Sequence, residues 1–148
     1  MESFMKRIIE GLTPKKLFEL DRYDFEKISI KKDVVEDIID FAKANYPSEF
    51  MAFLKGKFEQ KTLFVEGLLY QVFEKSRTSA FTRINLPVGS GVIGSVHSHP
   101  RRSGPSGQDK SFFSRFGGVH IIISYPYKKE DLMLYDNDGE KIDFNMIS

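Results

Sequence analysis

The sequence predicts an α/β fold of the mixed α+β kind, in which helices sandwich a mixed β-sheet. Strand-like segments outnumber helical ones, and the helical segments fall between strands rather than after them. The size agrees with this class, because 148 residues with 41% hydrophobic side chains suit one domain with a substantial core. We therefore expect a single domain over 27–148, preceded by an N-terminal extension over 1–26.

The extension at 1–26 carries apolar residues at helical spacing, and Gly11 and Pro14 would end such a helix. This pattern predicts a helical arm that packs against the domain, with a contact to a partner protein or in a homodimer as the alternative. The apolar residues of the arm are Phe4, Met5, Ile8, Ile9 and Leu12.

A strand and a helix open the domain. Residues 27–30 form a short β-prone segment, and Asp33 then stands where it would cap a helix. The helix has an apolar face at helical spacing, and Tyr46-Pro47 should end it. The residues of that face are Val34, Val35, Ile38, Ile39, Phe41 and Ala42.

The next segment, 48–56, is an apolar strand apart from Glu49 and Lys55. A carboxylate that opens a buried strand is costly unless it is solvated or paired. Glu49 therefore lies either at the solvated rim of the sheet or in a functional site, and the pattern alone leaves both readings open.

The second half of the chain predicts more strands and one more helix. Gly67 interrupts the apolar segment 62–73, which indicates a bulged strand. Ser106 stands where it would cap a helix over 107–116, closed by Gly117-Gly118. The other expected elements are strands at 80–86, 92–97 and 119–125, a loop at 87–91, and a hairpin of 132–135 and 141–146 around Asp138-Gly139.

Composition excludes several classes of protein. The 22 basic and 21 acidic residues give a net charge of +1, so nothing indicates a nucleic acid partner. The absence of cysteine excludes disulfides, cysteine nucleophiles and zinc fingers. No apolar run approaches the roughly 18 residues of a membrane span, and the charged start does not resemble a secretory signal. We expect a cytoplasmic protein without membrane contact.

Two of the three histidines, His97 and His99, lie at the end of an expected strand, and Pro100 follows them at once. Side chains at i and i+2 share one face of a strand, so both imidazoles can reach one metal. Asp109 shares the first turn of the expected helix with Ser106. Two histidines and one carboxylate make a three-ligand zinc site with an open fourth position, which is typical of catalytic zinc.

A hydrolase of this kind also needs a general base and a group that stabilises the oxyanion. Glu49 is the candidate base, and the Ser106 hydroxyl can donate to a tetrahedral intermediate. Purely structural roles compete, because Ser106 and Asp109 can form the capping box of the helix. We expect His120 to support the structure rather than to bind metal.

Taken together, these residues resemble the signature of a known family. His97-Ser98-His99-Pro100, followed by Ser106-Gly107-Gln108-Asp109, is similar to the H-x-H-P…S-x-x-D motif of the JAMM (MPN+) metalloproteases. Glu49 matches the upstream glutamate of that family. The resemblance covers about residues 27–147 and is strongest to compact archaeal members.

The resemblance implies a cytidine deaminase-like JAMM/MPN fold with one zinc ion per chain. It implies that His97, His99 and Asp109 bind the zinc, that Glu49 activates water, and that Ser106 supports the oxyanion. The implied activity is that of an isopeptidase, which cleaves the C-terminus of a ubiquitin-like modifier from a lysine of a target protein. The implied partners are therefore ubiquitin-like modifier proteins and their conjugates.

Two other functions stay open at this point. One is a zinc amidohydrolase that acts on a small molecule or on a carrier-protein thiocarboxylate adduct. The other is a non-catalytic module that binds a ubiquitin-like protein or assembles a complex, although all five polar positions of the motif are filled. Nucleotide deamination is disfavoured, because that chemistry normally uses cysteine ligands.

Overall fold

The computed structural model describes residues 24–70, 91–115 and 118–148. Several expected segments lie outside these ranges: nearly all of the N-terminal arm, the strand at 80–86, most of the loop at 87–91, and the end of the helix that Ser106 should cap.

In the described part of the chain, eight strands form one mixed sheet with the order β7-β6-β5-β4-β2-β3-β1-β8. The pairs β1–β3, β1–β8 and β4–β5 are parallel, and the other neighbours are antiparallel. The strands are β1 (Lys27–Lys31), β2 (Met51–Glu59), β3 (Thr62–Tyr70), β4 (Val92–His99), β5 (Val119–Ser124), β6 (Leu132–Tyr135), β7 (Lys141–Ile142) and β8 (Asn145–Ile147).

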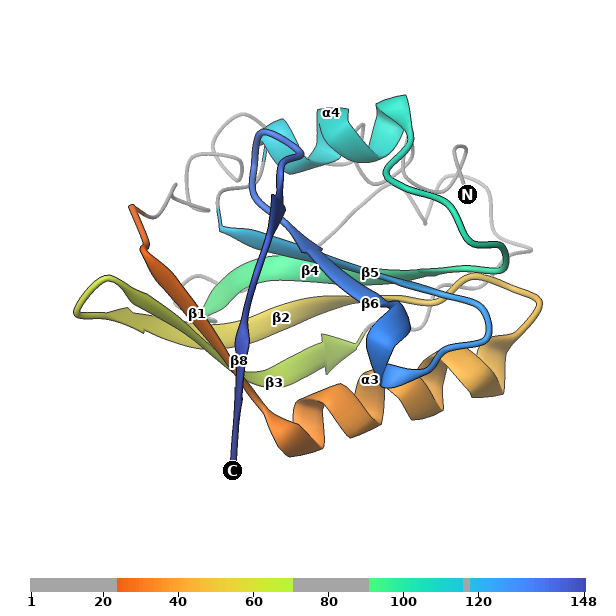
Figure 1. Cartoon of the computed structure of the whole chain (residues 1–148), viewed down its shortest axis with the longest axis horizontal. Coiled ribbons are helices and arrows are strands. Elements are labelled where there is room, and N and C mark those ends of the chain that lie inside the picture. Colours follow the sequence, from red (N-terminus) through yellow and green to blue (C-terminus); the bar gives the residue numbers. More distant parts are fainter. Residues whose placement is uncertain (1–23, 71–90, 116–117) are drawn as a thin grey trace.

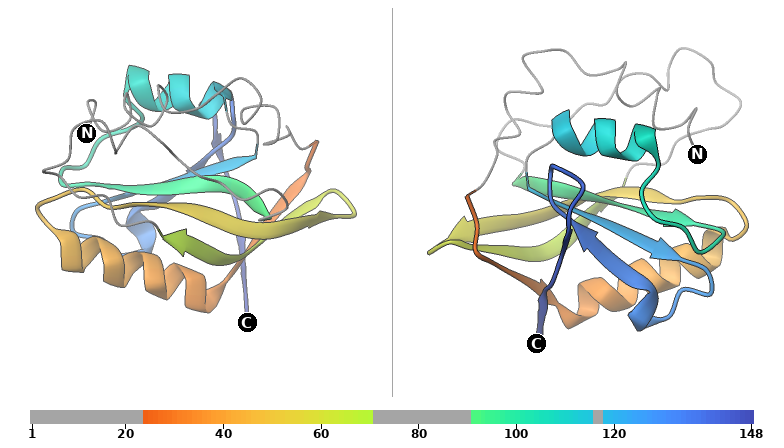
Figure 2. Two further views of the ribbon diagram at one scale, coloured as in Figure 1. Left: turned by 180° about the vertical axis from the view of Figure 1, so that it is seen from behind. Right: turned by 45° about the horizontal axis from the view of Figure 1, so that its top comes forward.

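Two helices cover opposite faces of this sheet (Figures 1 and 2). Helix α3 (Lys32–Asn45) lies along one face, α4 (Gly107–Arg115) lies across the other, and a short 3₁₀ helix, η2 (Lys129–Asp131), precedes β6. The predicted class, a mixed sheet sandwiched by helices, is confirmed. Among the described residues, no helix is long and apolar enough to cross a membrane.

Helix α3 buries the apolar face that its sequence predicts. Its buried residues are Val34, Val35, Ile38 and Ala42, and Tyr46 terminates it as expected. The predicted cap at Asp33 is wrong: Lys31 occupies the cap position, without a side-chain hydrogen bond, and Asp33 lies in the first turn. Because β1 runs directly into the helix, Asp33 already has helical backbone geometry, and its charge instead complements the helix dipole.

Strand β4 lies in the middle of the sheet, and all eight of its residues are buried. It pairs with β2, with Met51 opposite His97, and with β5, with His99 opposite Ser124. Gly94 permits the close approach of β5, because a Cβ atom there would overlap the carbonyl oxygen of Val119. The sheet thus fixes the backbone that carries both histidines.

Three features of the strands show where the sequence pattern predicts the structure and where it does not. The predicted bulge near Gly67 is confirmed, because the register shifts from Lys55–Gly67 to Gly56–Val65. The strand expected over 48–56 begins only at Met51. The single strand expected over 141–146 is wrong. It divides into β7, which pairs with β6, and β8, which pairs with β1 at the opposite edge of the sheet.

Candidate metal centre

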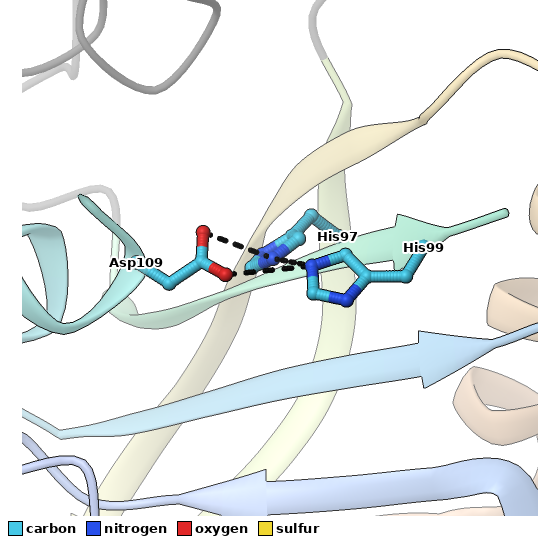
Figure 3. Close-up of side chains that lie close together, drawn as sticks. All are labelled: His97, His99 and Asp109. Carbon is cyan, nitrogen blue, oxygen red and sulfur yellow. Dashed lines mark hydrogen bonds and ion pairs between the residues drawn. The ribbon is translucent and has the colours of Figure 1, made fainter. Parts of the chain in front are cut away.

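The end of β4 and the first turn of α4 bring three ligand atoms together (Figure 3). His97 and His99 project from the same face of β4, because they are two residues apart. Their Nε2 atoms lie 3.0 Å apart. The two Asp109 carboxylate oxygens lie 3.4 Å from the His97 Nε2 and 3.4 Å from the His99 Nε2, respectively.

This cluster is almost inaccessible to solvent. His97 and Asp109 are fully buried, and His99 is 7% exposed. Burial lowers the pKa of His97, which keeps the imidazole neutral and able to bind a metal. Burial alone would raise the pKa of Asp109, but its close contacts with the imidazoles of His97 and His99 hold that pKa well below its usual range.

The donor set fits a divalent metal such as zinc. Asp109 Oδ1 and His97 Nδ1 are buried and have no hydrogen-bond partner within the described ranges. Two imidazole nitrogens and a buried anionic oxygen converge, and a cation among them would offset the cost of desolvating the carboxylate. Within the part of the chain that the structure describes, these three residues form the only such cluster.

The capping box predicted for the second helix is confirmed. The Ser106 hydroxyl accepts a hydrogen bond from the Asp109 N–H at 3.0 Å, and the Ser106 N–H donates to Asp109 Oδ2 at 2.9 Å. The cap therefore fixes the aspartate rather than competing with its place in the cluster. Because the Ser106 oxygen acts as an acceptor here, its own O–H remains able to donate.

Ser103 is a further residue of the site, and the sequence did not predict it. Its hydroxyl oxygen lies 2.8 Å from His99 Nδ1. When Nδ1 carries the proton and donates it to Ser103, Nε2 keeps a lone pair directed at the cluster. A serine in a Gly-, Pro- and Ser-containing loop gives no signal of this role.

Glu49 lies beside the cluster but is not part of it. The Phe50 N–H donates to Ser98 Oγ at 2.8 Å, and the Ser98 N–H donates to the Phe50 carbonyl at 3.0 Å. The two strands therefore stay in contact one residue beyond the Met51–His97 pair. Glu49 precedes Phe50 there, and the charges of His99 and Asp109 act on its pKa, so its carboxylate lies near the cluster. Glu49 is half-buried, and this burial raises its pKa.

His120 lies outside the cluster, on β5. Its Nδ1 is 2.8 Å from Ser95 Oγ, and its ring stacks on Phe113 at 4.3 Å between centroids. Phe113 is one turn after Asp109 on α4 and also faces His97, at 6.5 Å. This stack joins α4 to the sheet, so the geometry of His120 agrees with the structural role expected for it.

The loop between the ligands is held on its outer side. Arg102, although mostly exposed, donates to the buried carboxylate of Asp131 at 2.7 Å, and the other oxygen of Asp131 accepts the Lys128 N–H at 2.9 Å. This ion pair connects the loop after His99 to η2. It restricts the segment that carries Ser103 against His99.

Comparisons with known proteins agree with this geometry. Residues 31–137 match the family model described as prokaryotic homologs of the JAB domain. The chain is 30% identical over 132 residues to a probable metalloprotease of Haloferax volcanii, covering 82% of this chain and 81% of that protein.

Solved structures extend the comparison. A JAB1/MPN domain protein from Archaeoglobus fulgidus superimposes with a TM-score of 0.63 at 30% identity, covering 83% of this chain and 99% of that one. A structure described as a JAMM metalloprotease-like zinc site in the proteasome and signalosome gives a TM-score of 0.62 at 29% identity, with 83% and 100% covered. A protein from Desulfitobacterium hafniense shares the fold, with a TM-score of 0.54 at 20% identity, covering 81% of this chain and 92% of that one. The family match spans most of the chain, and the protein therefore belongs to the JAMM/MPN family, among its prokaryotic homologs of the JAB domain.

Proposed function

We propose that this protein is a zinc-dependent metalloprotease. More narrowly, we propose an isopeptidase that cleaves the bond between the C-terminus of a ubiquitin-like modifier and a lysine of a target protein. The observation that carries the proposal is the convergence of three buried ligand atoms, all within 4.8 Å of one another, beside a half-buried glutamate. The similarity to a probable metalloprotease and to a metalloprotease-like zinc site supports it.

His97, His99 and Asp109 would hold the zinc ion. When bound, zinc supplies a Lewis acid that polarises a carbonyl and makes a water molecule more acidic. Three protein ligands leave room for the reacting groups, as in other catalytic zinc sites. Ser103 keeps His99 in the tautomer that can bind the metal, and the capping box keeps Asp109 directed inward.

Glu49 is the proposed general base and acid. Burial raises the pKa of Glu49 toward the pH at which the enzyme works. A carboxylate with such a pKa can both take up a proton and return it. Glu49 takes a proton from the attacking water and delivers it to the nitrogen of the leaving amine. The effect of the His99 and Asp109 charges on the pKa of Glu49 supports this role, because it indicates that the carboxylate lies near the cluster.

Ser106 is the proposed oxyanion donor. Its hydroxyl already accepts the Asp109 N–H, which fixes the oxygen and leaves the hydrogen free to rotate toward a substrate. Donors of this kind act because they are oriented before the reaction begins. The amide carbonyl of the substrate would therefore lie between Ser106 and the ligand cluster.

Cleavage of a defined conjugate tests this proposal. The wild-type protein, supplied with zinc, should release a ubiquitin-like modifier from a lysine-linked conjugate, and a chelator should stop release until zinc is restored. The matched control is His97→Ala, which should show neither cleavage nor rescue by zinc. Zinc binding without cleavage of any conjugate would reject the isopeptidase activity, and cleavage that persists after complete removal of metal would reject the zinc mechanism.

A further inference from the structure

Three tyrosines lie next to the proposed catalytic groups. Tyr46 terminates α3, three residues before Glu49, while Tyr125 and Tyr127 follow β5. The Tyr125 N–H donates to the carbonyl oxygen of His99 at 3.0 Å. The α3–β2 and β5–η2 connections, which contain these tyrosines, lie at the same end of the sheet as the β4–α4 loop (Figure 1).

The rings of these residues form one cluster. Tyr46 stacks on Tyr125 with 4.7 Å between ring centroids and an interplanar angle of 27°. Tyr127 meets both rings edge-on, at 6.1 Å from Tyr46 and 5.7 Å from Tyr125. Tyr127 is only 2% exposed, whereas Tyr46 and Tyr125 are 47% and 46% exposed. A rigid aromatic pair, supported from beneath, therefore faces solvent beside the site.

The Tyr127 hydroxyl is a second observation that points to a ligand. It is buried and has no hydrogen-bond partner among the described residues. Burial raises the pKa of Tyr127, and the charge of Glu49 contributes in the same direction, which indicates that the phenol lies within electrostatic range of that carboxylate. A buried donor without a partner is costly, so such a group usually meets a partner in the functional state.

The position of the cluster determines which part of a substrate it meets. Glu49 must come within hydrogen-bond reach of the leaving nitrogen to protonate it. Residues grouped around Glu49 therefore surround the leaving amine rather than the acyl part of the substrate. The leaving amine of an isopeptide is the end of an aliphatic lysine chain, which packs well on aromatic rings. Its nitrogen is cationic once Glu49 has protonated it and before the C–N bond breaks.

We propose that Tyr46 and Tyr125 form a platform for the lysine side chain of the leaving group, with the Tyr127 hydroxyl available to its nitrogen. This inference rests on the proposed isopeptidase function and adds to it a preference for lysine over shorter amines. The carboxylate of Glu49 and the aromatic faces match the charge of the protonated nitrogen.

Two substrates with the same modifier tail test the platform: one is joined to the Nζ of an acetyl-lysine amide, the other to methylamine. Tyr46→Ala and Tyr125→Ala should lower kcat/KM about 5- to 30-fold for the lysine substrate and less than about twofold for the methylamide. Tyr125→Phe should keep the preference. Phe58→Ala removes another exposed aromatic, on β2, and should change neither rate. Equal losses on both substrates would overturn the proposal, as would no loss on either.

A binding measurement separates this inference from the activity itself. Nα-acetyl-lysine methylamide, added to the full-length chain, should shift the NMR signals of the tyrosine rings, and its norleucine analogue, which lacks the amine, should bind at least fivefold more weakly. If the wild type cleaves neither substrate, the proposed function fails, while this titration still tests the platform. The absence of tyrosine shifts, or equal binding of the two amides, would overturn it.

Discussion

Glu49 combines features that are costly in a purely structural residue. It lies where the pairing of β2 with β4 runs out, is half-buried, and has a raised pKa because of that burial. The negative charge of Asp109 raises this pKa further, while His99 opposes the shift. These features support the proposed role of Glu49 as the group that exchanges a proton.

Replacing Glu49 should separate metal binding from catalysis. We expect Glu49→Gln to lower kcat by about 10²- to 10⁴-fold, because the amide cannot carry the proton to the leaving amine. Zinc content should stay at the wild-type level, because Glu49 does not belong to the ligand cluster. Parallel measurement of hydrolysis and of zinc by atomic spectrometry checks both expectations. Loss of zinc in this variant would assign Glu49 to the metal site instead.

At the level of single residues, the sequence predicts which three side chains converge, but not the residues that orient them. His97 and His99 stand out because a period of two places them on one face, and Asp109 because it shares a helical turn with Ser106. Ser103 carries no comparable signal. Its role depends on a loop conformation that tertiary contacts such as Arg102–Asp131 restrict.

Helix α4 contributes both to stability and to the proposed chemistry. Its first turn contains the cap at Ser106 and the carboxylate of Asp109, and its second contains Phe113, which stacks on His120. The sequence predicts the cap because Ser-x-x-Asp is a local signal. It does not predict the stack, because His120 lies on a separate strand.

Substitutions at Ser106 should distinguish these two roles. Ser106→Ala should lower the free energy of unfolding by about 1 kcal/mol through loss of the cap, and lower kcat by about 10²-fold through loss of the oxyanion donor. Ser106→Gly should restore most of the stability but none of the activity, because glycine is tolerated at helix caps. Thermal denaturation and steady-state kinetics measure the two effects. Full activity in Ser106→Gly would exclude the hydroxyl from the reaction.

Strand β4 depends on a close approach to β5. Gly94→Ala should lower the free energy of unfolding by about 2–3 kcal/mol or prevent folding, because its Cβ would overlap the Val119 carbonyl. Gly67→Ala is the matched control, because a Cβ there meets nothing within 4 Å. Its stability should be unchanged or slightly raised. Urea unfolding compares the two, and equal stability would show that the strands can separate without cost.

The C-terminal strands show the limit of local pattern. The turn at Asp138-Gly139 forms as predicted, with the Gly139 N–H bonded to the Asp136 carbonyl and Gly139 at a φ of 82°. The partner of β8 could not be predicted, because β1 is the distant strand that receives it. Pairing across the whole sheet depends on tertiary packing, which an alternating pattern does not encode.

For the whole molecule, the charge states of the site couple stability to pH. The pKa of buried His97 lies below its ordinary value of 6.5, so below that pH the unfolded chain gains a proton that the folded chain does not. His97 therefore lowers the stability of the metal-free protein as the pH falls. Glu49 acts in the opposite sense, because its raised pKa lets the folded state take up a proton first, above the ordinary value of 4.5.

Acid should therefore destabilise metal-free Glu49→Gln more steeply than the wild type between about pH 7 and 5. The variant lacks the opposing contribution of Glu49, so that of His97 remains. In both proteins the pKa of Asp109 lies below its ordinary value of 3.8, so its stabilisation is lost as the pH falls below that value. Urea unfolding in the presence of a chelator, at a series of pH values, measures these slopes. A shallower dependence of stability on pH in Glu49→Gln than in the wild type would contradict the opposite contributions assigned to His97 and Glu49.

The proposed function depends on one zinc ion that His97, His99 and Asp109 hold together. Zinc per chain, measured by native mass spectrometry after reconstitution and removal of free metal, tests it most directly. We expect one zinc ion in the wild type and in Glu49→Gln, and strongly reduced occupancy in His97→Ala, His99→Ala and Asp109→Ala. A wild-type chain that retains no zinc, or an Asp109→Ala chain that retains a full equivalent, would contradict it.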